Sequence, residues 1–221
     1  MVAARPVRIS FSVLLRISDD DRYVLFNSPT RPGTCGPPGG VIKYFPPAVG
    51  ILEPLGFRQE RGGVRPEVVR WDLRGMLPHR SVRQFLRWYH TGAYREDADE
   101  CLRREFSEEL GEVGLSRLDV GLRTLKFAPV RTVVEGPHDV PGKPHRQLRR
   151  FEVYDLQVSG GPALRLRAQL FEIGADPRFP DVICASRADI AHGRLGSSMI
   201  APQSAFLFGD TRLTPDVPPI L

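Results

Sequence analysis

The chain has 221 residues, of which 41% are hydrophobic and 26% charged. These proportions are ordinary for a globular protein and exclude wholesale disorder, and the length allows one substantial core or at most two small domains. No apolar run approaches the roughly 20 residues of a membrane helix, and the first residues lack the apolar segment of a signal peptide. We therefore expect a cytoplasmic protein that does not bind membranes.

The charge balance favours an anionic partner only weakly. Lys and Arg number 31 against 26 Asp and Glu, a formal net charge of +5. The sequence has neither a recognised nucleic-acid-binding motif nor a basic run, so nucleic-acid binding is the least favoured function. Cys35, Cys101 and Cys184 lie far apart without a Cys-x-x-Cys pair, which predicts free thiols in a reducing compartment.

In chain order, the first half of the sequence predicts a β-hairpin, a Pro/Gly-rich loop and two helices. Residues 7–17 alternate in part and predict a strand, and residues 22–27 predict its partner after an acidic turn. Ser81 is expected to begin a helix that Gly92 ends. The other predicted elements are a loop over 29–40, a strand over 41–45, a helix over 46–55, a strand over 68–73 and a helix over 82–90.

The clearest helix of the sequence is predicted over residues 96–110. Leu102, Phe106 and Leu110 recur every four residues and form one apolar stripe, and Gly111 or Gly114 can end the helix. Beyond it we expect strands over 120–127 and 130–134, a loop over 136–147, a hairpin of 148–158 with 164–171, a strand over 182–186, and helical turns at 187–192 and 202–208.

Three carboxylates on this helix carry the chemical signal. Glu105, Glu108 and Glu109 stand at i, i+3 and i+4, so they share one helix face, where each exposed like-charged pair costs a few tenths of a kcal/mol. A hard divalent cation with oxygen ligands offsets that repulsion, and it can also bridge a phosphate and hold a water for attack. The competing interpretation is a solvated acidic helix face.

Residues 104–111 (REFSEELG) resemble the core of the Nudix box, Gly-x5-Glu-x7-Arg-Glu-U-x-Glu-Glu-x-Gly-U, in which U is a bulky apolar residue. Glu96 fits the first glutamate, and Pro38-Gly39-Gly40 resembles the turn that opens the box. Two departures stand out. Between Gly40 and Glu96 lie 55 residues instead of five, and Glu112 occupies the last apolar position.

The order of motifs around this interruption resembles the SMODS-associated NUDIX family, from about residue 8 to residue 208. Its members are linked to bacterial cyclic-oligonucleotide antiphage signalling. The resemblance implies an α/β Nudix fold, a mixed β-sheet sandwiched between helices (α/β/α), with a long insertion inside the Nudix box. We expect a single domain over residues 1–213, in which residues 41–94 form a subdomain, and a loose tail over 214–221.

The resemblance also implies roles for the residues of the box. Glu105, Glu108 and Glu109 would bind Mg²⁺ or Mn²⁺ together with the carbonyl of Gly40, and Arg104 would orient the carboxylates. Arg104 and the three glutamates are thus the expected catalytic set. A water activated by the cation would attack a phosphorus of a diphosphate linkage, with either a box glutamate or a side chain from a later loop as the base. Gly39, Glu96 and Gly111 are expected to be structural.

Further residues permit a functional and a structural interpretation. Lys143, Arg146 and Arg149, with Arg150 beside them, would collect phosphate oxygens or would form a solvated basic face. Four aromatic residues would stack on a base or would belong to the core: Trp71, Phe85, Trp88 and Tyr89. His138 and His145 would act as acid or base or would be ordinary loop histidines.

The function that these patterns favour is metal-dependent hydrolysis of a nucleotide-type small molecule. The sequence contains no Gly-x-Ser-x-Gly, Walker A or Gly-x-Gly-x-x-Gly pattern, which leaves serine hydrolases, P-loop proteins and Rossmann proteins without support. The alternative is a Nudix-fold module that senses a nucleotide, such as a cyclic oligonucleotide, without turnover. The substrate and the oligomeric state are not determined by the sequence.

Overall fold

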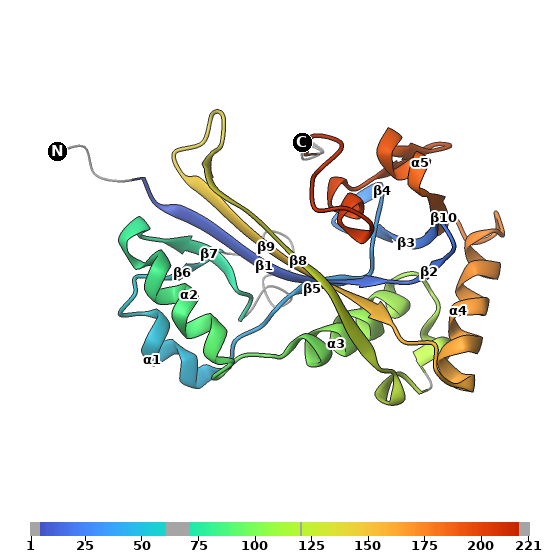
Figure 1. The fold of residues 1–221 in the computed structure, drawn as a ribbon, viewed down its shortest axis with the longest axis horizontal. Coiled ribbons are helices and arrows are strands. Elements are labelled where there is room, and N and C mark those ends of the chain that lie inside the picture. The colour runs from blue at the N-terminus through green and yellow to red at the C-terminus, as the bar shows by residue number, and fades with distance from the viewer. Residues whose placement is uncertain (1–4, 61–70, 120, 217–221) are drawn as a thin grey trace. The chain divides into compact units, whose positions relative to one another are not determined.

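The computed structural model describes residues 5–60, 71–119 and 121–216. They form an α/β protein whose strands are divided between two sheets (Figure 1). The chain folds into two compact units, each built from three segments: residues 1–13, 40–101 and 134–151 form the first unit, and residues 14–39, 102–133 and 152–221 form the second. The predicted α/β class is confirmed, although the single-domain organisation stays a prediction.

The first sheet has the strand order β6-β7-β1-β9-β8, with β5 also paired to β1. From Val7 to Val13 of β1, alternate residues are buried, because successive side chains of a strand point to opposite faces. β7 pairs antiparallel with two strands, β1 and β6. The strands are β1 (Val7–Arg16), β5 (Gly39–Val41), β6 (Arg58–Gln59), β7 (Arg74–Leu77), β8 (Phe127–Asp139) and β9 (Arg146–Leu156).

Helices of the first unit pack aromatic side chains against β1. Phe11 of β1 meets Phe85 and Tyr89 of α2 edge-on, at ring-centroid distances of 5.4 Å and 4.7 Å. Gly92, at φ +73°, ends α2 as predicted, whereas the Ser81 side chain makes no capping hydrogen bond because a 3-10 turn precedes the helix. These elements are η1 (Pro46–Ala48), α1 (Val49–Leu52), η2 (His79–Ser81) and α2 (Val82–Thr91).

The second sheet has the order β10-β3-β4-β12-β11, with β2 also paired to β3. It is mixed, because β12 and β4 are parallel while β3 pairs antiparallel with β10 and β4. Its strands are β2 (Ser18–Asp19), β3 (Arg22–Ser28), β4 (Arg31–Gly36), β10 (Val182–Ser186), β11 (Arg194–Leu195) and β12 (Ser198–Ile200). In addition to α3, the second unit contains these helices: η3 (Ser116–Asp119), η4 (Leu122–Thr124), α4 (Gly161–Gly174), α5 (Arg187–His192) and η5 (Pro202–Leu207).

Helix α3 (Ala98–Glu112) confirms the predicted apolar stripe. Leu102, Phe106 and Leu110 are fully buried, and the Phe106 ring stacks on that of Phe26 from β3 at 6.0 Å. The helix continues through Gly111, and the positive φ of +73° that glycine tolerates best occurs at Gly114 instead. Because the apolar side of α3 faces the core, the carboxylates lie on its other side.

Three expectations about local structure were wrong. Leu164–Phe171 is part of helix α4, because Leu166, Leu170 and Ile173 are buried at helical spacing. The loop expected over 29–40 contains β4, whose Pro and Gly fall where the register with β3 shifts. The loop expected over 136–147 is short, since β8 extends to Asp139 and β9 begins at Arg146.

Two smaller expectations have mixed outcomes. Of the strand expected over 120–127, residues 122–124 form a 3-10 turn and β8 begins at Phe127, while residue 120 lies outside the described part. In the strand expected over 68–73, Asp72 forms a bridge to Lys43, while residues 68–70 lie outside the described part. The three cysteines are free thiols, as predicted. Within the described ranges, none of the helices has the length and apolarity needed to cross a membrane.

The packing of α3 predicts a large stability loss on truncation of Phe106. Replacement by alanine removes a ring that is 1% exposed and leaves a cavity, so we expect the free energy of unfolding in urea to fall by about 3–5 kcal/mol. Leu164→Ala, at a residue of α4 that is half exposed, should change it by no more than about 0.5 kcal/mol. Equal losses in the two variants would contradict this packing.

Candidate active site

Arg104 lies between two of the α3 carboxylates. Its Nη1 is 2.6 Å from Oε1 of Glu105 and 3.7 Å from Oε2 of Glu108. Both the Arg104 and the Glu105 side chain are largely buried, whereas that of Glu108 is 47% exposed. A partly buried, charge-assisted contact is stronger than an exposed one, so Arg104 offsets part of the repulsion on this face of α3.

The third carboxylate, Glu109, accepts a backbone hydrogen bond from the Pro-Gly-Gly turn. The N–H of Gly39 donates to its Oε2 at 2.9 Å. Gly39 has φ +131°, a conformation that favours glycine, so the turn presents its N–H to the helix in a way other residues would resist. This contact joins two parts of the predicted box that lie 70 positions apart in the chain.

Burial makes the charged form of Glu109 unfavourable. Loss of water around the carboxyl raises its pKa well above the usual range. The hydrogen bond from Gly39 opposes that rise, and the charges of Glu105, Glu112 and Glu108 add to it. A bound cation would reverse this balance, because it stabilises the carboxylate form.

The donor chemistry of the three glutamates fits a hard divalent ion. Carboxylate oxygens are the ligands that Mg²⁺ and Mn²⁺ prefer, and these three stand on one face of α3. Their side chains nevertheless contact different partners, since Glu105 contacts Arg104 and Glu109 contacts Gly39. Among the residues that the structure describes, no three His, Cys, Asp or Glu side chains are grouped to hold a metal ion. Coordination by all three therefore requires a change of side-chain conformation.

Glu96 and Gly40 belong to the first unit. The buried Glu96 carboxylate accepts from the N–H of Lys43 at 2.9 Å, and the Glu96 N–H donates to the Lys43 carbonyl at 2.8 Å. These two hydrogen bonds join Glu96 to Lys43, and the bracing role expected for Glu96 stays a prediction. The Gly40 carbonyl lies 3.8 Å from the Cys101 thiol, so its role as a metal ligand stays a prediction.

Two of the three expected phosphate-binding residues have carboxylates close by, all in the first unit. Arg149 lies 3.7 Å from Glu135, with both side chains largely buried, and Arg146 lies 3.9 Å from Asp139. Lys143 is exposed at the tip between β8 and β9. Because Arg149 is paired with a carboxylate, it is a less suitable phosphate ligand than the exposed Lys143.

The aromatic residues favour the core interpretation. Phe85 and Tyr89 are almost inaccessible and Trp88 is 7% exposed, so none of the three presents an open ring face. Trp71 meets Tyr44 edge-on at 5.4 Å. Burial and the nearby charges of Arg8 and Lys143 lower the pKa of His145, while His138 is an exposed residue of β8.

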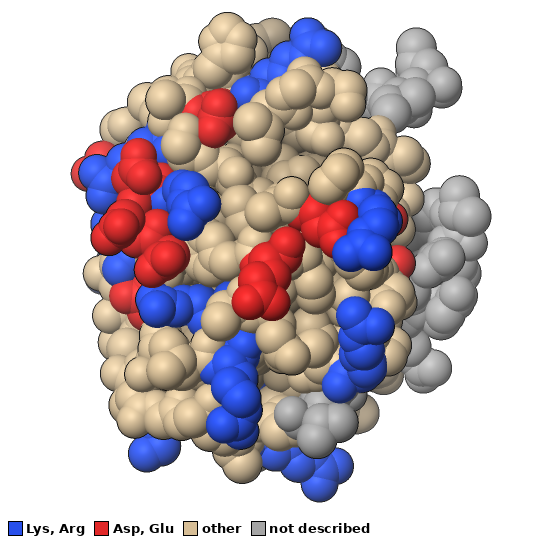
Figure 2. Space-filling model, turned by 90° about the vertical axis from the view of Figure 1, so that its right-hand side faces the viewer, with Lys and Arg blue, Asp and Glu red and all other residues tan. Residues whose placement is uncertain are grey.

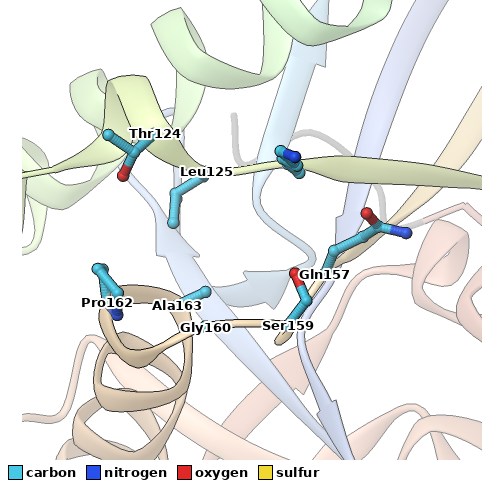
Figure 3. Close-up of a pocket in the computed structure, with 8 residues that line it drawn as sticks. Thr124, Leu125, Gln157, Ser159, Gly160, Pro162 and Ala163 are labelled. Carbon is cyan, nitrogen blue, oxygen red and sulfur yellow. The ribbon is translucent and has the colours of Figure 1, made fainter.

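A small cavity of about 160 Å³ opens in the second unit, at the beginning of α4. Figure 3 shows Leu125 on one wall, pointing toward Ala163 on the other. The sequence analysis missed it, because residues 159–162 were expected to form a hairpin turn and not to begin a helix. The lining residues are Thr124, Leu125, Lys126, Gln157, Ser159, Gly160, Pro162 and Ala163.

The surface charge agrees with the modest basic excess of the sequence. On the face shown in Figure 2, acidic and basic side chains lie among one another, with uncharged surface between them. Such a surface lacks the continuous basic stripe of a typical nucleic-acid-binding face.

Comparison with known protein families gives one match of wide extent. The model of a family described as the SMODS-associated NUDIX domain matches residues 6–208. The match includes the Pro-Gly-Gly turn, the whole of residues 41–94 and the acidic helix α3. Comparison with curated proteins finds no match.

The raised pKa of Glu109 predicts a pH-dependent gain in stability on its replacement. The folded state binds this proton more tightly than the unfolded state. The resulting stabilisation is therefore complete below the unfolded pKa, about 4.3, and is lost as pH rises through the folded pKa. Glu109→Gln keeps an acceptor for Gly39 without the charge, so its melting temperature should exceed that of the parent at neutral pH, by a margin that shrinks on acidification.

Glu172→Gln is a matched control, because it alters an exposed glutamate on another helix of the same unit. The melting temperatures of the parent and the two variants would be measured across pH. Only Glu109→Gln should exceed the parent's melting temperature by a margin that grows as the pH rises. A Glu109→Gln variant less stable than the parent at neutral pH would refute the idea of a costly buried charge.

Proposed function

The chain belongs to the SMODS-associated NUDIX domain family, and on this premise we propose that it is a divalent-metal-dependent hydrolase that cleaves a diphosphate linkage in a nucleotide derivative. The observation that carries the proposal is the arrangement on α3. Glu105, Glu108 and Glu109 share one face, and the Pro-Gly-Gly turn is hydrogen-bonded to Glu109. A solvated acidic helix face would not require that backbone contact.

Each residue of this arrangement has a distinct task in the proposal. A bound Mg²⁺ or Mn²⁺ would supply positive charge to the diphosphate oxygens and acidity to a water. Arg104 holds Glu105 and Glu108 in place, through contacts of 2.6 Å and 3.7 Å. The N–H of Gly39 fixes the orientation of Glu109. The base that accepts the proton of the attacking water is either a box glutamate or a residue of a later loop.

The family association also supports a proposal about context. We propose that the nucleotide ligand belongs to bacterial cyclic-oligonucleotide antiphage signalling and that the protein acts in the cytoplasm. Lys143 remains the best candidate for a phosphate contact from β8 and β9, since it is exposed at their tip.

A second candidate function is nucleotide sensing without turnover, and one observation favours it. Arg104 and Gly39 already satisfy the α3 carboxylates without a cation, and the described residues contain no assembled metal group. A sensor needs only a stable fold that recognises its ligand. The two functions differ in one measurable property, which is product formation that depends on divalent metal.

Glu108→Gln tests the hydrolase proposal. The substitution preserves shape and hydrogen-bonding capacity but removes one charge from the carboxylate set, so we expect metal-dependent turnover to fall by orders of magnitude. Phosphate or nucleotide release would be followed with Mg²⁺ and with Mn²⁺, on a panel of nucleoside diphosphate derivatives and cyclic oligonucleotides. Stability should hardly fall, because a like-charged neighbour is removed.

The matched control is Glu112→Gln, an exposed glutamate at the end of the same helix that is outside the proposed set. It should retain the activity of the parent. Equal turnover by Glu108→Gln and the parent would remove Glu108 from the mechanism. Specific nucleotide binding by the parent, without turnover of any compound on the panel, would favour the sensor.

A further inference from the structure

A short three-stranded ladder in the first unit is built around residues 42–45. On one side, the N–H of Tyr44 donates to the Trp71 carbonyl at 2.8 Å and Lys43 forms a bridge to Asp72. On the other side, Tyr44 forms an antiparallel bridge to Arg95, and the N–H of Phe45 donates to the Tyr94 carbonyl at 2.8 Å. Phe45 and Tyr94 therefore stand opposite each other at the end of this ladder.

The two faces of the ladder differ sharply. Tyr44 is 7% exposed, and the Arg95 guanidinium lies 4.1 Å from the centre of the Tyr89 ring, so this pair faces inward. One step along, Phe45 is 41% exposed and Tyr94 51% exposed. Successive residues of an extended segment point to opposite faces, and this accounts for the outward position of Phe45, whose backbone is extended. Tyr94 is a turn residue, and its exposure is a separate observation.

These are the two aromatic members among the large hydrophobic side chains that are exposed in the described part of the chain. The remaining members are aliphatic: Val134, Leu164, Met199 and Leu213. Single exposed apolar residues are normal on any protein surface and need no explanation. Phe45 and Tyr94 differ from these, because a backbone hydrogen bond joins the two residues and both aromatic side chains are exposed.

The backbone that presents this pair is strained. Tyr94 has φ +60° and Trp71, on the other flank of the ladder, has φ +72°. The left-handed region is unfavourable for a bulky residue, and such conformations gather at functional sites. The strain at Tyr94 holds a large apolar ring in water, which neither packing nor solubility explains.

We propose that Phe45 and Tyr94 form a stacking surface for the nucleobase of a nucleotide ligand. This inference rests on the proposed function, because it assumes a ligand of the nucleotide class. Every nucleobase has a π face, and an exposed aromatic ring stacks on it irrespective of the base's identity. Two rings offer far less than the roughly 800 Å² per partner of a stable protein interface, so a single planar ring fits this surface better than a protein does.

The chemistry around the pair suits a ligand that also carries phosphate. Lys43, one position before Tyr44 in the ladder, contributes a half-buried cation, and the exposed Pro46 and Pro47 that follow Phe45 keep the rim apolar. The Glu96 backbone is tied to Lys43 on the far side of the same ladder. The box residue Glu96 thereby fixes the segment that carries Tyr94.

The test measures binding of AMP, GMP, CMP and UMP by the intact protein in EDTA. Ribose 5-phosphate, which lacks a base, is the ligand control. We expect Phe45→Leu and Tyr94→Leu each to weaken binding of the monophosphates about tenfold, because each substitution removes one aromatic ring on which the base can stack. Phe45→Tyr, which keeps a ring, should retain the parent affinity, and so should Leu164→Ala, which removes an exposed aliphatic side chain of the second unit.

Binding of ribose 5-phosphate as tightly as AMP would overturn the proposal, as would unchanged affinity in both leucine variants or no binding of any monophosphate at millimolar concentration. Weaker binding by Phe45→Leu together with the parent affinity in Phe45→Tyr would support the proposal. A folding defect would not depend on whether the substituted residue carries an aromatic ring. Because EDTA removes the catalytic ion, the outcome is independent of whether the protein hydrolyses its ligand.

Discussion

The hydrogen bond from the Gly39 N–H to the Glu109 carboxylate is the contact on which the account of the site depends. It holds the Pro-Gly-Gly turn against α3, although 55 residues separate Gly40 from the first glutamate of the box. The contact needs glycine geometry at Gly39 and a helix whose opposite side is buried. Both are present, so the interruption of the box in sequence does not separate the turn from the acidic helix in the fold.

Three glutamates on one face of α3 repel one another, and two kinds of contact reduce the cost of this repulsion. Arg104 lies next to Glu105 and Glu108, and the backbone of Gly39 supports Glu109, whose pKa is nevertheless raised by burial. A protein that used these residues only for stability would gain from fewer charges at this place. In the proposed function a cation would join them, and Arg104 would limit the repulsion while the cation is absent.

Much of this could be predicted from the sequence, for a physical reason. The apolar stripe of α3 is a local property of one helix, and its burial was predicted correctly. The α4 helix was missed because Leu164, Arg165, Leu166 and Arg167 alternate as a strand would, whereas burial of Leu166, Leu170 and Ile173 follows the helical period. The ion pair of Arg149 with Glu135 and the pairing of Phe45 with Tyr94 depend on neighbours distant in sequence, which periodicity does not reveal.

The most direct test of the central claim is the number of Mn²⁺ ions that the intact protein binds. Electron paramagnetic resonance of free Mn²⁺ during a titration measures this number without a substrate. The account predicts at least one ion per chain that is lost when Glu105 and Glu108 are both replaced by glutamine and retained in Glu112→Gln. No Mn²⁺ bound at millimolar concentration, or the same binding in the double variant as in the parent, would contradict it.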